Sequence, residues 1–481
     1  MPQILKRFSS GIEGLDEITG GGLIADSTYI IQGHPGSGKT IFANQIAFHQ
    51  AARGASVLYV TLLAESHERL FAFLSTLQFY DPSKLGRGVT YVSAFTTMEQ
   101  EGLDGVIKLL RREIPRQKAT LLVLDGLLNA REKAANTLEM KKFIAELQSH
   151  ASFVNCTALL LTSARFEESS PEYTMVDGVI ELREEEYGVR TMRRLRVRKS
   201  RGSAASGGLH QYMIRESGIA LYPRLEAHLA TPSVPDEQSL ARTSCGLQRV
   251  DEMLSGGLPV ASTTVVIGPS GCGKTSWGLN FLCASTSQEP GLHYGFYETQ
   301  PRLQRKAKAI GLDMDPLIAS GALTLEWRPP VERMADVIGH DLLKRVTQLG
   351  AKRLFIDGLG AIERGMLTTG RIVPWFSALV NELRARGVTV LVSAEANNLF
   401  DPAPTLPAPE MLSVVDNIVL MRFVEMEARI HRVFSMVKVR DSAFDPMLHD
   451  FNITDQGIVV TERLLGKDLT NDLPSPTGRP A

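Results

Sequence analysis

The sequence predicts two tandem α/β domains, each with a mainly parallel sheet flanked by helices. Three observations predict them. The motif G-x-x-x-x-G-K-T occurs twice, at residues 33–40 and 268–275. Each copy lies between an apolar strand pattern and a helical pattern, and strands and helices alternate after it, as they do in parallel sheets. A chain of 481 residues is also long enough for two domains of ordinary size.

Each motif copy predicts a loop that binds the phosphates of a nucleotide. Its glycines let backbone N–H groups curl around phosphate oxygens, its lysine reaches the β- and γ-phosphates, and its threonine hydroxyl ligates Mg²⁺. The following helix directs its N-terminus at the same phosphates. A plain glycine-rich turn explains one copy, but not two in matching contexts. The predicted loops consist of Gly33, His34, Pro35, Gly36, Ser37, Gly38, Lys39 and Thr40, and of Gly268, Pro269, Ser270, Gly271, Cys272, Gly273, Lys274 and Thr275.

The repeat extends beyond the loops to a whole domain. Residues 7–18 match residues 242–253. We call this segment before each loop the lead. The offset between the two copies is 235 residues at the lead (244 − 9) and also at the loops (268 − 33), so the two copies align without a gap between lead and loop. So long a period excludes a solenoid. We expect a first domain at 1–228, a linker at 229–240, a second domain at 241–464 and a disordered tail at 465–481.

Composition and charge are those of an ordinary globular protein. Hydrophobic residues make up 43% and charged residues 22%, and the net charge is −1. So small a net charge argues against a surface that coats nucleic acid, although a local basic patch stays open. No apolar run approaches a membrane span, and the four cysteines, including Cys272, lack the spacing of metal ligands. We therefore expect a cytoplasmic protein with free thiols and no membrane contact.

Alternating patterns continue through both halves, where β-branched apolar runs predict strands and amphipathic runs predict helices. In the first half we expect strands at 28–31, 56–62, 90–93, 120–125 and 157–162, and helices at 40–50, 66–77, 103–115 and 137–149. In the second half we expect strands at 264–267, 294–297, 322–325, 353–357 and 388–392, helices at 275–282, 302–310, 334–349 and 375–386, and a proline-rich loop at 398–409.

One strand in each half ends in a carboxylate. Residues 120–125 end in Asp125, and residues 353–357 end in Asp357. In an open parallel sheet this tip lies beside the bound nucleotide, where an aspartate holds the water shell of Mg²⁺. A helix cap is the alternative, but the upstream loops favour the metal role. We therefore predict Thr40 and Asp125, and Thr275 and Asp357, as metal-binding pairs.

Each half closes with a predicted antiparallel hairpin, at 178–183 and 190–201 and at 417–424 and 431–440. Residues 184–188 form the acidic turn of the first hairpin. A basic stretch follows this turn, and three interpretations of it stay open: a solvated strand balanced by the acidic turn, a sensor for phosphates bound by a neighbouring subunit, and a strip that binds nucleic acid. The stretch contains Arg193, Arg194, Arg196, Arg198, Lys199 and Arg201.

Taken together, these motifs resemble the RecA superfamily, and most closely its KaiC branch of double-domain, hexameric ATPases. The resemblance is carried by the repeated lead S-x-G-[IL]-x-x-[LV]-D-E-[IM], both loops, both strands that end in aspartate, and the K-x-R segments at the hairpin ends. It implies two RecA-like P-loop domains that bind ATP and Mg²⁺ in a hexameric ring. It also implies that Lys199, Arg201, Lys438 and Arg440 reach a nucleotide bound by the neighbouring subunit.

The sequence departs from the family where the catalytic carboxylate is expected. The family has a Glu-Glu pair after the strand that follows the loop helix. The second half keeps only Glu298, and in the first half, where one residue is inserted, only Glu65 can serve. A general base must lie within about 3 Å of the water or act through one bridging molecule. We therefore predict Glu298 as the active base, although a solvated strand-end acid is the alternative, and we expect slow hydrolysis, if any, with Glu65.

Two further departures limit what the resemblance implies. Asp441 replaces the glycine of the K-x-R-G signature in the second half. The clock member of the family phosphorylates an adjacent serine and threonine before its second hairpin. Here only Ser413 remains, because Leu412 cannot accept phosphate. The tail also lacks resemblance to the family's partner-binding tail, so the sequence gives no ground for a circadian role.

The sequence is compatible with three functions. The leading hypothesis is a KaiC-like ring ATPase that hydrolyses ATP slowly at subunit boundaries, acts as a nucleotide-dependent switch on an unidentified protein partner, and carries serine/threonine autokinase activity as a weaker addition. The second is a DNA-associated, RadA-like recombinase or helicase-type motor, which needs a basic surface bearing aromatic residues. The third is a non-hydrolysing scaffold in which ATP joins the subunits.

Overall fold

The computed structural model describes residues 5–164, 170–234, 240–331, 334–366, 368, 370–396, 410–426, 429–440 and 442–463. Several sequence predictions fall outside these ranges. They are the tail at 465–481, the loop at 398–409, residues 235–239 of the linker, and Asp441.

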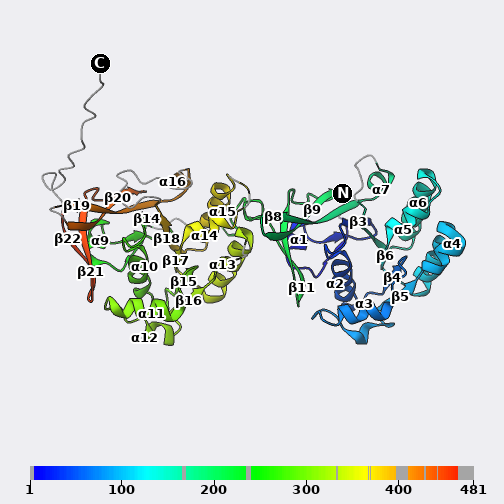
Figure 1. Ribbon diagram of the computed structural model, residues 1–481, viewed down its shortest axis with the longest axis horizontal. Coiled ribbons are helices and arrows are strands. Elements are labelled where there is room, and N and C mark those ends of the chain that lie inside the picture. Colours follow the sequence, from blue (N-terminus) through cyan, green and yellow to red (C-terminus); the bar gives the residue numbers. More distant parts are fainter. Residues whose placement is uncertain are drawn as a thin grey trace, which may run out of the picture. The chain divides into compact units, whose positions relative to one another are not determined.

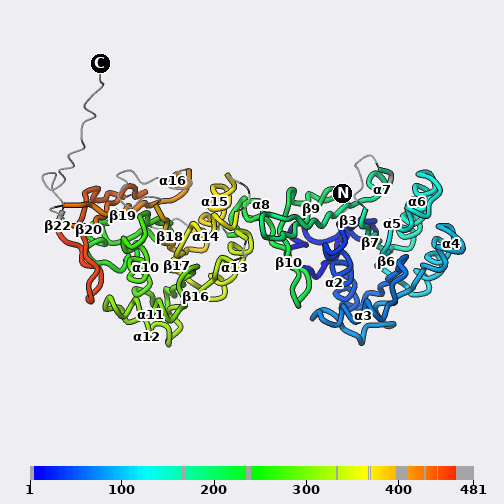
Figure 2. Tube along the Cα trace, viewed as in Figure 1, coloured from blue at the N-terminus to red at the C-terminus, as the bar shows by residue number. Residues whose placement is uncertain are grey.

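The chain divides into two compact units, Met1–His228 and Leu229–Ala481, which Figure 1 shows as ribbons and Figure 2 as a continuous trace. Each unit contains a nine-stranded sheet flanked by helices and one small two-stranded sheet. The predicted fold class, a tandem pair of α/β domains, is therefore confirmed. Among the described residues, no helix is both long enough and apolar enough to cross a membrane.

The sheet of the first unit has the order β11-β10-β9-β8-β3-β7-β6-β4-β5. The strands from β8 to β5 are mutually parallel, and the other three continue the sheet as antiparallel neighbours. The strands are β3 (Thr28–Gly33), β4 (Val57–Thr61), β5 (Val89–Ser93), β6 (Leu121–Asp125), β7 (Thr157–Thr162), β8 (Gly178–Tyr187), β9 (Arg190–Ser200), β10 (His210–Arg215) and β11 (Gly218–Tyr222). The main helices are α2 (Lys39–Ala52), α3 (His67–Leu74), α4 (Phe95–Arg116), α5 (Leu127–Lys133), α6 (Thr137–Phe153) and α7 (Pro171–Met175).

The second unit repeats this order strand for strand as β22-β21-β20-β19-β14-β18-β17-β15-β16. Its strands are β14 (Thr263–Gly268), β15 (Gly291–Gly295), β16 (Leu323–Trp327), β17 (Arg353–Asp357), β18 (Thr389–Glu395), β19 (Asn417–Met426), β20 (Arg429–Val439), β21 (His449–Thr454) and β22 (Gly457–Arg463). Its main helices are α10 (Lys274–Cys283), α11 (Gln300–Ala309), α13 (Ala335–Leu349), α14 (Leu359–Arg364), α15 (Ile372–Ala385) and α16 (Met411–Val414).

Both faces of each parallel sheet are buried. In β4 of the first unit, Leu58 and Val60 belong to one hydrophobic cluster, which α4, α5 and α6 complete. The alternate residues Val57 and Tyr59 belong to another, which α2 completes. Burial on both faces explains why the strand patterns in the sequence are continuously apolar rather than alternating. The P-loop strand β3 lies inside the sheet, between β7 and β8.

The repeated lead closes on its own aspartate. Ser10 donates from its backbone nitrogen and its hydroxyl to Asp16 Oδ1, at 2.9 and 2.6 Å. In the second unit the backbone nitrogen of Cys245 donates to Asp251 Oδ1 at 2.8 Å. Each carboxylate therefore fixes the turn before the first strand of its sheet, which gives this part of the family motif a structural role.

The hairpins are longer than the sequence predicted, and the predicted turn at 184–188 is wrong. Strand β8 continues to Tyr187, which pairs with Arg190, so the turn consists of Gly188 and Val189. Gly188 adopts φ +60°, which a two-residue hairpin turn requires and which glycine adopts without strain. Within this ladder Glu184 on β8 forms an ion pair with Arg193, its cross-strand partner on β9, at 3.3 Å. The sequence analysis also missed β10, β11, β21 and β22, which widen each sheet.

The predicted linker begins inside the second compact unit. The backbone nitrogen of Ser233 donates to Glu382 Oε2 at 2.7 Å, and the Ser233 hydroxyl donates to Glu382 Oε1. Glu382 is fully buried at 0% exposure, and Arg386 also donates to it, at 2.7 Å. Burial alone would raise the pKa of Glu382, but the bonds from Ser233 and Arg386 outweigh it, so the pKa is lowered. Residue 233 is therefore anchored to α15.

Removing the Ser233 hydroxyl should destabilise the second unit. We expect Ser233→Ala to lower its free energy of unfolding by about 1–3 kcal/mol, because a buried carboxylate loses one hydrogen bond. All three tryptophans, Trp277, Trp327 and Trp375, lie in this unit, so tryptophan fluorescence during urea unfolding measures it directly. Ser233→Thr keeps the hydroxyl and serves as the control. An unchanged midpoint in Ser233→Ala would contradict the anchor.

Candidate nucleotide-binding sites

The second P-loop joins β14 to α10 in the predicted conformation. A Cβ on Gly268 would collide with the carbonyl oxygen of Met421, and Gly273 adopts φ +109°, so both positions require glycine. The Lys274 ammonium donates to the carbonyls of Gly268 and Pro269, each at 2.7 Å. The lysine is thus held inside the loop that is predicted to receive the phosphates.

The first P-loop repeats this arrangement between β3 and α2. Lys39 donates to the carbonyls of Gly33 and His34, at 2.8 and 3.0 Å. The Tyr212 hydroxyl on β10 donates to the carbonyl of Ser37 at 2.5 Å and so ties the loop to a strand that the sequence analysis missed. The first loop therefore has a support that comes from outside its strand and helix.

Each threonine of the P-loops faces the aspartate predicted from the sequence. Thr40 Oγ1 lies 3.4 Å from Asp125 Oδ2, and Thr275 Oγ1 lies 3.1 Å from Asp357 Oδ2. The two residues of each pair are more than 80 positions apart in the chain. They meet because parallel strands β3 and β6, or β14 and β17, end at the same edge of the sheet.

The two aspartates have different neighbours, which the sequence analysis missed. Tyr59 on β4 donates to Asp125 Oδ2 at 2.9 Å. In the second unit Ser393 on β18 donates to Asp357 Oδ1 at 2.7 Å, and the buried ring of His293 on β15 lies 3.8 Å from Asp357 Oδ2. These neighbours lie on strands adjacent to those that carry the aspartates. Their contacts could have been predicted only from the register of the sheet, which determines which residues of adjacent strands lie side by side.

The different neighbours give the aspartates opposite pKa shifts. Burial raises the pKa of Asp125, and the bond from Tyr59 only partly offsets this. Burial acts in the same direction on Asp357, but contacts with His293, Ser393 and Thr275 outweigh it, so the pKa of Asp357 is lowered. The negative charge that a cation site needs is therefore better stabilised in the second unit.

The oxygen donors at both sites fit Mg²⁺, which prefers carboxylate, hydroxyl and water oxygens. Within the part of the chain that the structure describes, no group of three or more His, Cys, Asp or Glu residues could hold a metal by itself. A Mg²⁺ ion held by Thr275 and Asp357 would thus complete its shell with phosphate oxygens and water, as Mg²⁺ commonly does. The donor set therefore suits a metal that arrives with a nucleotide.

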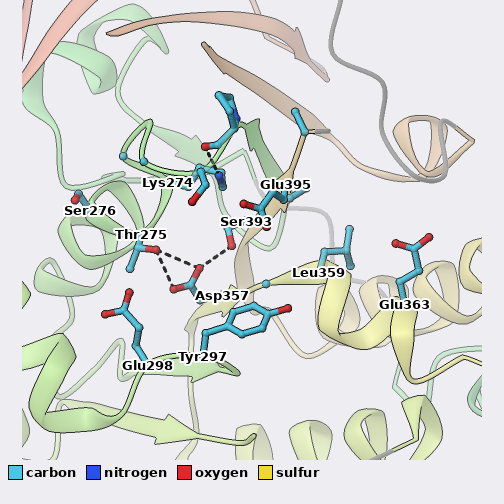
Figure 3. A pocket seen from close by; sticks show the side chains of 18 of the residues that line it. Lys274, Thr275, Ser276, Tyr297, Glu298, Asp357, Leu359, Glu363, Ser393 and Glu395 are labelled. Carbon is cyan, nitrogen blue, oxygen red and sulfur yellow. Dashed lines mark hydrogen bonds between the residues drawn. The ribbon is translucent and has the colours of Figure 1, made fainter. Parts of the chain in front are cut away.

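A pocket of about 1130 Å³ lies over the second P-loop. Figure 3 shows the side chains of several strands and helices directed into it. The Glu298 carboxylate points toward Thr275 and Asp357, and in this view Glu395 lies on the opposite side of Asp357 from Glu298. The pocket therefore collects most of the predicted residues of the second site, namely Lys274, Thr275, Glu298 and Asp357, with Ser393 and Glu395 in addition.

The two candidate bases occupy matching positions at the start of a helix. Glu298 directly precedes Thr299, the N-cap of α11, and Glu65 directly precedes Ser66, the N-cap of α3. The first unit has one residue more between its strand and this cap, in agreement with the predicted insertion. Glu65 is half-exposed and its nearest cation is Arg69, at 3.7 Å.

The four predicted interface residues bind the end of a short helix in their own unit. Lys199 donates to two carbonyls in the last turn of α7, both at 2.9 Å, and Lys438 donates to two carbonyls of the α16 segment at 2.9 and 2.7 Å. Arg201 and Arg440 each contact the aspartate directly before the hairpin, at 3.6 and 3.3 Å. Lys438 and Arg440 do not line the pocket of their own unit, so contact with a neighbour's nucleotide stays a prediction.

Glutamates on β8 pair with three of the six basic residues in the stretch of the first hairpin. This matches the first of the three interpretations, in which the strand is balanced by nearby acids, although the acids lie on β8 and not in a turn. The pairs are Arg193 with Glu184 at 3.3 Å, Arg194 with Glu185 at 3.3 Å, and Arg198 with Glu181 at 2.6 Å.

Fold and site together define an ATPase with two RecA-like P-loop domains. The chain belongs to the KaiC ATPase family, because the family model described as "ATPase: KaiC" matches residues 8–226 and 243–464. These ranges include both P-loops and both candidate metal pairs.

Individual relatives match over nearly the whole chain. The "Circadian clock oscillator protein KaiC" of Rippkaea orientalis is 24% identical over 96% of this chain and 89% of its own length. The "Circadian clock oscillator protein KaiC 1" of Synechocystis sp. is 24% identical over 94% of this chain and 88% of its own length. The "Circadian clock oscillator protein KaiC" of Synechococcus elongatus is 23% identical over 95% of this chain and 89% of its own length.

Neutralising the two aspartates should have opposite effects on the metal-free and nucleotide-free chain. At pH 7 we expect Asp125→Asn to stabilise the first unit, because the pKa of Asp125 is raised and its charge is unfavourable there. Asp357→Asn should destabilise the second unit, because the pKa of Asp357 is lowered and its charge is favourable. Hydrogen exchange of β6 and β17 measures each unit separately.

Acid provides the control for this comparison. The benefit of Asp125→Asn should fade as the pH falls and Asp125 takes up its own proton. Changes of the same sign in both units at pH 7 would contradict the assignment of opposite electrostatics.

Proposed function

We propose that this protein is a Mg-ATP-dependent ring ATPase in which nucleotides bound at subunit boundaries are hydrolysed slowly and the nucleotide state acts as a regulatory switch. One observation carries the proposal. In the second unit the carboxylate of Glu298, directly before the N-cap of α11, faces Thr275 and Asp357 in one pocket. The family assignment supports ATP as the nucleotide.

The residues of the second site divide the work as follows. Lys274 and the loop N–H groups bind the triphosphate, and Thr275 and Asp357 hold Mg²⁺. The ion, when bound, neutralises charge on the β- and γ-phosphates. Glu298 orients the attacking water and accepts its proton, which requires a reach of about 3 Å. Water exclusion comes from the neighbouring subunit in this proposal.

The two units have different tasks. The second unit hydrolyses ATP, because its candidate base Glu298 lines the pocket and the pKa of its Asp357 is lowered. The first unit binds ATP with little turnover, and this bound ATP stabilises the assembled ring. Its aspartate carries a raised pKa, and Glu65 lies on an exposed turn next to Arg69.

Ring assembly is part of the proposal. Lys199, Arg201, Lys438 and Arg440 are assigned to the nucleotide of the adjacent subunit, and a hexamer follows from the family resemblance. The relatives are named as clock oscillator proteins. We leave that role out for this chain, because Leu412 occupies one of the two positions at which the clock member accepts phosphate. The partner that reads the ring state is a protein.

Two alternatives have less support. A DNA motor needs free positive charge, and Arg193, Arg194 and Arg198 are paired with glutamates. A non-hydrolysing scaffold would have no use for a carboxylate at the position of Glu298.

Turnover and molar mass, measured together, test the main proposal. We expect a nucleotide-dependent hexamer whose turnover falls at least ~100-fold in Glu298→Gln and in Lys274→Ala, because each removes a catalytic or phosphate contact. Lys39→Ala should weaken assembly but keep the turnover of each second-unit site in the rings that do form. DNA should not stimulate any of them. A chain that stays monomeric with ATP, or turnover that no substitution changes, would contradict the proposal.

Autokinase activity is a weaker addition. Ser413 is exposed on α16, and its hydroxyl donates to the carbonyl of Glu410 at 2.7 Å. We expect γ-labelled ATP to label the wild-type chain and not Ser413→Ala. Equal labelling of the two chains ends this hypothesis without affecting the ATPase proposal.

A further inference from the structure

The Glu298 carboxylate has a cation of its own in the pocket of the second unit. The Lys306 ammonium forms an ion pair with Glu298 Oε1 and is also its hydrogen-bond donor. Lys306 lies on α11, seven residues after the N-cap Thr299, so the pair links the start of the helix to the end of its second turn. Both side chains line the pocket, and they are 37% and 25% exposed.

We propose that Lys306 is a positioning residue that holds Glu298 in the orientation required for hydrolysis. This inference rests on the proposed function, in which Glu298 is the base of the second site. The ammonium binds Oε1 and leaves Oε2 available to the attacking water. Because a displacement of about 1 Å at a reacting group can reduce the rate ~100-fold, a fixed carboxylate is worth far more than the ion pair itself.

The surroundings of Lys306 distinguish this pair from an ordinary surface ion pair. The basic residues of α11 are Arg302, Arg305, Lys306 and Lys308. Arg302 and Arg305 are exposed, and Lys308 pairs with Asp315 outside the pocket. Lys306 is the one of the four that lines the pocket. Exposed pairs contribute little to stability, whereas this one orders a half-buried group beside the P-loop.

The first unit provides an internal comparison. Counted from its N-cap Ser66, the position that matches Lys306 is occupied by Phe73, which is exposed. Glu65 instead faces Arg69, whose side chain is 71% exposed. Among the described residues, the ion pair of Glu65 is thus with a largely exposed cation and not with a half-buried one. This difference parallels the proposed division between a hydrolysing second site and a first site with little turnover.

Lys306→Met tests the inference in the full-length chain. We expect kcat to fall about 10-fold while the affinity for a fluorescent ATP analogue changes less than twofold. Lys306→Arg, which keeps a cation in reach of Glu298, should retain most of the turnover. Arg305→Met, which removes an exposed cation from the same helix, should behave as wild type. Equal tryptophan-fluorescence unfolding midpoints for all variants would show that the second unit is folded.

The results that overturn the inference differ from those that overturn the proposed function. If Lys306→Met weakens ATP binding as much as it lowers kcat, Lys306 acts on the phosphates and not through Glu298. If it leaves kcat unchanged while Glu298→Gln abolishes turnover, the positioning role is wrong and the ATPase proposal stands. If Glu298→Gln itself retains full turnover, the base assignment fails, and the positioning role fails with it.

Discussion

The contact between the P-loop threonine and the strand-end aspartate is the constraint on which each unit depends. Thr275 lies on the first turn of a helix and Asp357 at the tip of a strand, yet their oxygens approach to 3.1 Å. They meet because β14 and β17 run in the same direction and end at the same edge of the sheet, with β18 between them. The strand order, the buried faces of the sheet and the crossover helices together hold Thr275 and Asp357 at this contact.

The repeat preserves that geometry while changing its electrostatics. Both units place a buried aspartate opposite a threonine, but Tyr59 supports one carboxylate and Ser393 with His293 supports the other. The backbone of a duplicated domain is thus conserved in shape, and the side chains on adjacent strands set how well each copy tolerates negative charge. The two sites therefore differ in their electrostatics without any change of fold.

The sequence was sufficient to predict the fold class, the P-loops and the strand-end aspartates Asp125 and Asp357, because these depend on local patterns or on the repeat. It was insufficient for Tyr59, Ser393 and Lys306, whose partners are set by strand register or by a helix turning back on its start. The tight hairpin turn at Gly188 was missed because the glutamates before it look like a loop when their cross-strand arginine partners are not considered. Contacts of Lys199 and Lys438 with helix carbonyls were missed because backbone acceptors leave no mark in a sequence.

The bond between Ser233 and Glu382 also decides where the second half of the chain can be separated from the first. A recombinant fragment that starts at residue 241 would lack Ser233 and leave a buried carboxylate with Arg386 as its remaining partner. A fragment that starts at residue 229 would keep the hydrogen bonds from both Ser233 and Arg386 to the Glu382 carboxylate. Counted from the last residues of α6 and α15, the position in the first unit that matches Glu382 is His150, so the first unit has no carboxylate there.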